Sequence, residues 1–176
     1  MIDFARITVK SGDGGNGCGS FHKIKGKRYG KADGGDGGNG GNVYVEATSD
    51  LTTLEKYRYV KDYRAQRGGN GLSRRRRGAG GEDLALKVPV GTLIKVTKVT
   101  EEPKEPKDVS KKPLAPLAPL EPLSLYDLTE PGQRVLVARG GQGGRGNLHL
   151  RDEFGRRPKV GEVGEVGEMV QLTLEL

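Results

Sequence analysis

The 176-residue sequence contains one cysteine, two histidines, no tryptophan and no long hydrophobic run. One thiol cannot form an internal disulfide, and one cysteine with two histidines is too few ligands for a structural zinc site, so both are excluded. No segment approaches the roughly 18 uninterrupted apolar residues of a membrane span, and the first ten residues resemble a strand rather than a secretory signal. We therefore expect a protein without a membrane partner, in a reducing compartment.

Apolar residues are also scarce, at 33% of the chain. Globular domains usually have about 45 to 50%, so a large hydrophobic core is not expected. Thirty basic residues outnumber 23 acidic ones, which gives a net charge of +7 and an isoelectric point near 9.5. A balance this basic favours a polyanionic partner such as nucleic acid.

Glycine, in contrast, is abundant, and 24 of the 30 glycines fall in three clusters. Within residues 34–41 and 140–146 the glycine pattern repeats every three residues, which is the period of a polyproline II helix. Glycine at two of every three positions leaves most of each extended helix without side chains, which would let neighbouring helices approach closely. Each run is too short for collagen, and the alternative is a flexible linker.

Segments of strand character separate the glycine clusters. Residues 169–176 place Val170, Leu172 and Leu174 on one face and polar residues on the other, as in a half-buried antiparallel strand. The same alternation occurs at Ala5, Ile7 and Val9; Val43, Val45 and Ala47; Leu84, Leu86 and Val88; Ile94 and Val96; and Val135 and Val137. These patterns predict a mainly β protein with a small barrel or sandwich base. Glycine-rich projections would leave this base at about residues 11–42, 66–82 and 139–168.

Two segments depart from this plan. Residues 52–64 have room for one helical turn, but Tyr57, Tyr59 and Tyr63 alternate better as a strand. Residues 100–123 form a proline-rich insertion in which Pro113 and the following prolines recur every third residue. The insertion is predicted to be an extended spacer, and its Pro-x-x-Pro spacing leaves open a ligand for an aromatic-grooved domain.

The motifs of common enzymes are weak or missing. Residues 12–17 match G-x-G-x-x-G after a predicted strand, but the residues that follow contain too much glycine for the helix that should hold a pyrophosphate. No G-x-x-x-x-G-K-[ST] phosphate loop occurs, and no nucleophile motif accompanies the two histidines. The sequence predicts that this chain is not an enzyme and holds no metal or other cofactor.

The basic residues gather beside the glycine clusters, where they are predicted to form three RNA-binding loop tips. Four consecutive arginines repel one another unless a polyanion neutralises them, and Phe21, Tyr29, His22, His149 and Phe154 are placed to stack on unpaired bases. A solvated charged surface is the alternative. The predicted contact residues are Lys23, Lys25, Lys27, Arg28 and Lys31 in the first tip; Arg67, Arg74, Arg75, Arg76 and Arg77 in the second; and Asn147, His149, Arg151, Arg156 and Arg157 in the third.

These motifs, taken in order, resemble the opening of the Obg family of ribosome-associated GTPases. The resemblance rests on residues 11–17 and 33–43, on Val88-Pro89-Val90-Gly91-Thr92, and on residues 138–147, and it covers nearly the whole chain outside 100–123. It implies an Obg fold, in which a β-barrel-like base carries a bundle of glycine-rich polyproline II helices. It also implies that the projecting loops bind rRNA of the large ribosomal subunit near the peptidyl-transferase region, during assembly or as a check on subunit joining.

On this resemblance residues 1–176 form a single Obg domain. The resemblance also implies that the GTPase domain that follows in relatives, with its GTP and magnesium, lies outside this chain. A monomer in the bacterial cytoplasm is expected, with the mitochondrial matrix as the alternative location. Two other functions stay open: a disordered Arg-Gly-rich RNA binder, suggested by Arg67-Gly68-Gly69, and a protein-interaction module that acts through the proline-rich insertion.

Overall fold

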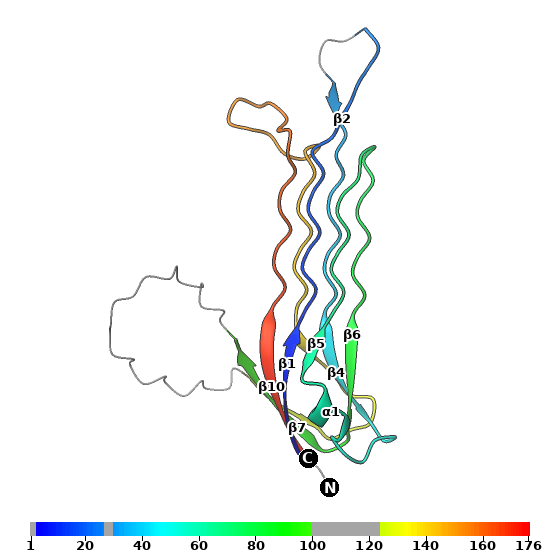
Figure 1. Ribbon diagram of the computed structural model, residues 1–176, viewed down its shortest axis with the longest axis vertical. Coiled ribbons are helices and arrows are strands. Elements are labelled where there is room, and N and C mark those ends of the chain that lie inside the picture. The colour runs from blue at the N-terminus through cyan, green and yellow to red at the C-terminus, as the bar shows by residue number, and fades with distance from the viewer. Residues whose placement is uncertain (1–2, 27–29, 100–123) are drawn as a thin grey trace, which may run out of the picture.

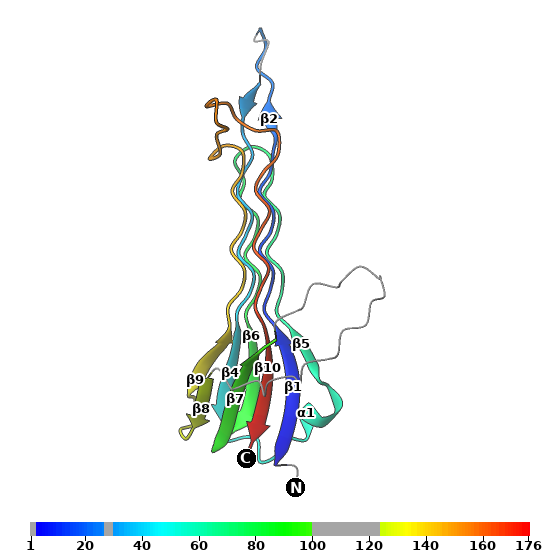
Figure 2. The same ribbon diagram turned by 90° about the vertical axis from the view of Figure 1, so that its left-hand side faces the viewer.

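The computed structural model describes residues 3–26, 30–99 and 124–176, and Figure 1 shows an elongated molecule with three regions. A base of β-strands lies at one end and includes the C-terminus. From it long glycine-rich segments run side by side as a shaft, and short loops form a tip at the far end (Figures 1 and 2). We define the shaft as residues 12–19, 34–42, 66–71, 78–83, 139–146 and 160–168. The tip is the described part of 20–33 with residues 72–77 and 147–159.

The base contains two open sheets. The larger has the order β5 (Asp62–Arg64), β1 (Phe4–Lys10), β10 (Met169–Glu175), β7 (Thr92–Lys98) and β8 (Ser124–Leu128). The smaller has the order β6 (Leu84–Pro89), β4 (Val43–Thr48) and β9 (Arg134–Ala138). The β1–β5 and β4–β6 pairs are parallel, and the other pairs are antiparallel. The strands predicted by alternation in residues 5–9, 43–47, 84–88, 94–96, 135–137 and 169–176 are confirmed.

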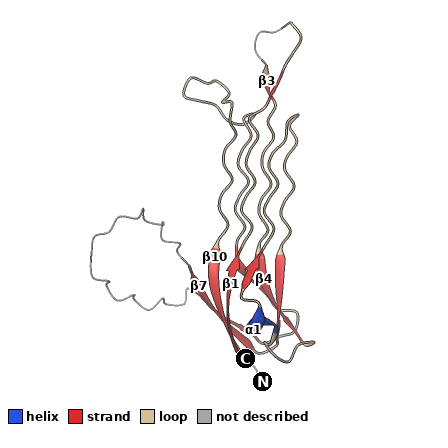
Figure 3. Cartoon of the chain, in the orientation of Figure 1, coloured by secondary structure: helices blue, strands red, loops and turns tan. Residues whose placement is uncertain are grey.

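The predicted barrel is not observed. Strands β5 and β8 are the edges of one sheet and β6 and β9 those of the other, and within the described residues no ladder joins them. The sandwich alternative fits, because the inward faces of both sheets share one hydrophobic core. Ile7, Val45 and Leu172 in that core are at most 1% exposed. Figure 3 shows strand structure only in the base and in a short hairpin at the tip.

The prediction for residues 57–59 was wrong in its favoured form. Lys56–Tyr59 form one helical turn, α1, and only Tyr63 lies in a strand. Residues two apart point to the same side of a strand but about 200° apart on a helix. Tyr57 is accordingly buried while Tyr59 is 72% exposed. The Tyr57 hydroxyl donates a 2.6 Å hydrogen bond to the Lys87 carbonyl, and burial raises its pKa above the ordinary value.

The shaft continues the strands of the base beyond the point where alternation gives way to glycine. The β1–β10 ladder ends at Lys10 opposite Met169, and the next contact is a hydrogen bond from the Ser11 N–H to the Glu168 carbonyl. Further along, Gly14 and Gly17 donate to the carbonyls of Glu165 and Glu162, both at 2.8 Å. Hydrogen bonds recur every three residues on the other side as well, where the N–H groups of Gly12, Gly15 and Cys18 donate to the carbonyls of Gly41, Gly38 and Gly35.

Side chains also join the shaft segments. The carboxylates of Glu162, Glu165 and Glu168 accept the backbone N–H groups of Arg145, Gln142 and Arg139. A Cβ added at most shaft glycines would overlap the backbone of an adjacent segment; at Gly143 it would meet the Gly37 carbonyl. Such close, hydrogen-bonded packing contradicts the flexible-linker alternative for these segments, and it does not fit a disordered RNA binder.

In residues 3–26, 30–99 and 124–176, no helix has the length and apolar character needed to cross a membrane. The proline-rich insertion at 100–123 lies outside the described residues.

Candidate nucleic-acid interface

The tip is centred on a hairpin of two short strands, β2 (Phe21–His22) and β3 (Lys31–Ala32). Phe21 pairs with Ala32 and His22 with Lys31, and the hairpin reaches furthest from the base (Figure 2). Lys23 and Lys25, which follow β2, are exposed. Lys27 and Arg28, also predicted as contacts, lie outside the described residues, as does Tyr29.

The arginine loop at 72–77 is tied to this hairpin by Asp33. Arg74 and Arg75 have positive φ angles of 61° and 59°, a conformation that costs energy in residues other than glycine. Asp33 stabilises this conformation with two hydrogen bonds. Its Oδ2 accepts the Arg74 N–H at 3.1 Å, and its backbone carbonyl accepts the Arg75 N–H at 2.7 Å. The 2.6 Å hydrogen bond from Ser20 is the main reason that the pKa of Asp33 lies below its ordinary value. Asp33 is therefore a charged anchor at neutral pH.

The third predicted loop, at 147–159, presents His149, Arg151 and Arg156 as exposed side chains. His149 Nε2 lies 3.7 Å from Asp36 Oδ2, at the end of the shaft. Arg157 is half-buried, and its guanidinium donates to the Asn147 carbonyl at 3.5 Å. Arg157 is thus more constrained than its neighbours.

Asn147 differs from the other predicted contact residues because its side chain is 0% exposed. Its Oδ1 accepts the Gly34 N–H at 2.9 Å, and its Nδ2 donates to the carbonyls of Ser20 and Pro158 at 3.0 and 3.1 Å. The side chain therefore connects three segments where the shaft meets the tip. This corrects the prediction of a direct RNA contact: Asn147 positions the loops that carry the cations.

Replacing Asn147 by alanine is expected to loosen the tip. The change leaves the buried Gly34 N–H and the Pro158 carbonyl without their partner, and each such group costs roughly 1–3 kcal/mol. Hydrogen exchange at Gly34 should become at least about tenfold faster, while amides of the base strands keep their protection. Asn70→Ala is the control, because it removes one exposed hydrogen bond, to the Asn16 N–H at 3.0 Å. Unchanged exchange at Gly34 in the Asn147 variant would argue against this role.

The structure brings the three loops together around Lys31. One depression is lined by Lys31 with His22, Arg74 and Arg75, and a second by Lys31 with Arg156 and Arg157. In the described part of the chain no arginine side chain forms an ion pair with a carboxylate. The tip therefore concentrates positive charge that is free to meet phosphate groups.

Arg67 does not belong to this group. Its neighbours Gln66 and Gly68 bond to Gly41 and Asp13, at the level where the shaft joins the base. Placing Arg67 in the same tip as Arg74 to Arg77 was therefore wrong. Sequence reasoning also missed Asp33 as an anchor and Leu148 as a lining residue. Their neighbours offered a signal, since Asp33 begins a glycine run and Leu148 is an apolar residue between predicted contacts.

Two comparisons with known proteins bear on this arrangement. The family model described as GTP1/OBG matches residues 2–112 and 121–176, and the internal gap at 113–120 falls within the proline-rich insertion. The chain is also 42% identical, over 176 residues, to the GTPase Obg of Prosthecochloris aestuarii (strain DSM 271 / SK 413). That alignment covers 100% of this chain and 47% of the relative, so the chain spans about half the length of that protein.

Proposed function

Because the chain belongs to the GTP1/OBG family, we propose that it is the rRNA-binding part of an Obg-type GTPase that acts on the large ribosomal subunit during its assembly. The observation that carries this proposal is the gathering of cations from three loops around Lys31, at the end of a long shaft. The tip docks near the peptidyl-transferase region. The protein acts as a monomer, and its bacterial relative favours the bacterial cytoplasm.

The shaft gives the tip its reach. We take its segments to be polyproline II helices, because their hydrogen bonds recur every three residues, as from Gly12, Gly15 and Cys18. Many mutual hydrogen bonds keep these segments side by side, so the loops are carried into a confined space without a large entropic cost on binding. Lysine and arginine side chains then neutralise rRNA phosphates and release counterions.

Sedimentation with isolated ribosomal subunits tests this proposal. We expect the chain to pellet with large subunits at low micromolar concentration and to bind small subunits at least about tenfold more weakly. A specific site on one subunit should exceed the general attraction of any RNA for a basic protein. Equal affinity for the two subunits would mean that charge alone drives binding.

The proposal also makes a prediction about nucleotides. The chain should neither bind nor hydrolyse GTP, because its glycine clusters lack the Lys and Ser/Thr that a phosphate loop supplies to the phosphates and Mg²⁺. In this view GTP and Mg²⁺ belong to the part of the relatives that this chain does not span. Isothermal calorimetry with GTP and MgCl₂ should give no binding heat up to about 1 mM GTP. Micromolar affinity would contradict the assignment.

A further inference from the structure

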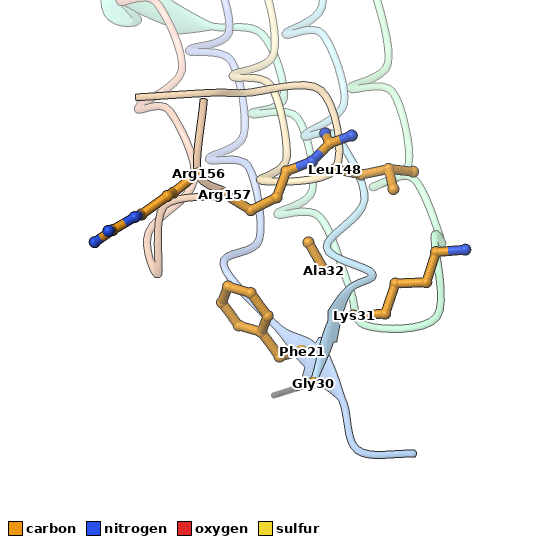
Figure 4. A pocket seen from close by; sticks show the side chains of 7 residues that line it. All are labelled: Phe21, Gly30, Lys31, Ala32, Leu148, Arg156 and Arg157. Atoms are coloured by element: carbon orange, nitrogen blue, oxygen red, sulfur yellow. The ribbon is translucent and has the colours of Figure 1, made fainter. Parts of the chain in front are cut away.

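One depression in the tip has the size and the lining of a ligand pocket. It encloses about 650 Å³ and is lined by Phe21, Gly30, Lys31, Ala32, Leu148, Arg156 and Arg157 (Figure 4). Ligand pockets commonly measure roughly 300–1,000 Å³ and combine apolar walls with a few polar groups. Here the apolar walls come from Phe21, Ala32 and Leu148, and the charged groups from Lys31 and the two arginines.

The hairpin explains why this space exists. Phe21 and Ala32 are paired residues on β2 and β3, so their side chains lie on the same face of the hairpin. Ala32 is small and 5% exposed, so it forms a shallow floor next to the Phe21 ring, which stays 40% exposed. A larger residue in place of Ala32 would fill the space.

The other wall is formed by the loop at 147–159. Figure 4 shows Arg157 and Leu148 on one side of Ala32 and Phe21 on the other, with the Arg156 guanidinium turned away from the space. The hydrogen bond to the Asn147 carbonyl restrains Arg157. A flat ring and a flat guanidinium thus border the same space, and both are surfaces on which RNA bases stack.

We propose that this pocket takes one unpaired base of single-stranded RNA, stacked on Phe21 beside Arg157, with a flanking phosphate held by Lys31. The inference rests on the proposed function, because it specifies the form of RNA that the tip binds. The side chains of Phe21, Ala32 and Leu148 have no polar atoms, so stacking should discriminate little among the four bases. An A-form duplex keeps its bases stacked inside and cannot offer one to this pocket.

Fluorescence anisotropy with labelled RNA hexamers tests the proposal on the whole chain. We expect wild-type protein to bind single-stranded hexamers of adenosine or uridine more tightly than a duplex of the same length. Phe21→Leu keeps an apolar side chain but removes the ring, and it should weaken single-strand binding roughly 5- to 150-fold. Phe21→Trp should restore it.

Phe4→Leu is the matched control, because Phe4 lies in the base, is 53% exposed and does not line the pocket. It should bind like wild type, and circular dichroism should show all three variants folded. Equal losses in the Phe21→Leu and Phe4→Leu variants, or equal wild-type affinity for duplex and single strand, would overturn the base pocket. So would competition by a polyglutamate peptide as effective as that by RNA.

Sedimentation separates this failure from failure of the proposed function. If the Phe21→Leu variant binds both hexamers and large subunits like wild type, the pocket holds no base although the chain still binds the subunit. If wild type does not pellet with large subunits, the proposed function fails, and the hexamer measurements then decide the pocket independently.

Discussion

Gly143→Ala is expected to separate the shaft segments while leaving the base folded. An alanine Cβ at this position would overlap the carbonyl of Gly37, a backbone atom of a neighbouring segment that cannot turn aside as a side chain can. The segments must move apart, which weakens the hydrogen bonds from Gly37 and Gly40 to the carbonyls of Gly144 and Gly141. We expect a local loss of at least about 3 kcal/mol, at the upper end of what overpacking costs. Hydrogen exchange at Gly37 and Gly40 should accelerate more than about 100-fold.

Gly80→Ala provides the control within the same shaft. A Cβ at Gly80 would find its nearest neighbour, the Asn39 carbonyl oxygen, at 4.0 Å, so the methyl group fits without displacing backbone. Its effect should stay within about ±0.5 kcal/mol. If the two alanine variants melted and exchanged alike, glycine would not be required for the close approach of the segments, and the packed shaft would be refuted.

The strands of the base were predictable because their signal is local. Alternation in residues 169–176 requires only that one face of a strand be buried, and Val170, Leu172 and Leu174 are each at most 1% exposed. The same argument cannot show whether a sheet closes. Closure depends on which strands meet at the edges, so the alternation predicted a barrel or a sandwich equally, and the structure has open sheets.

The existence of packed glycine-rich segments and basic loops was predictable, but the alignment of these segments with one another was not. Glycine spacing indicated that extended segments pack together, but not which residues lie at the same height. Arg67 was therefore grouped with Arg74 to Arg77, although the packing places it near the base. Asn147 sits among basic residues in the sequence, yet its partners Gly34 and Ser20 lie more than 100 residues away. Only the folded chain brings them together.

The second large effect is expected from the arginine loop. Changing Arg74, Arg75, Arg76 and Arg77 to glutamine keeps a Cβ at the two positive-φ positions and preserves the backbone bonds to Asp33. It removes four charges that have no carboxylate partner in the described part of the chain. Each lost phosphate contact on single-stranded RNA flattens the slope of log K against log[salt] by about 0.7, so two to four contacts change it by roughly 1.4 to 2.8. Affinity for large subunits should fall roughly 25- to 600-fold at about 0.1 M salt.

The control removes the same charge from the base. Lys56, Arg58, Lys61 and Lys87 are exposed residues of the base, and none of them forms an ion pair in the described structure. Their replacement by glutamine also subtracts four charges. Both variants should keep the wild-type circular dichroism spectrum, because exposed substitutions usually change stability by only about ±0.5 kcal/mol.

The salt dependence of large-subunit binding, measured for wild type and these two variants, tests most directly the claim that the tip is the RNA-binding end of the molecule. We predict a slope flattened by about 1.4 to 2.8 in the arginine-loop variant and a slope within about 0.7 of wild type in the base variant. Equal flattening in the two variants, or a larger effect from the base, would show that net charge rather than the tip governs binding and would contradict the account.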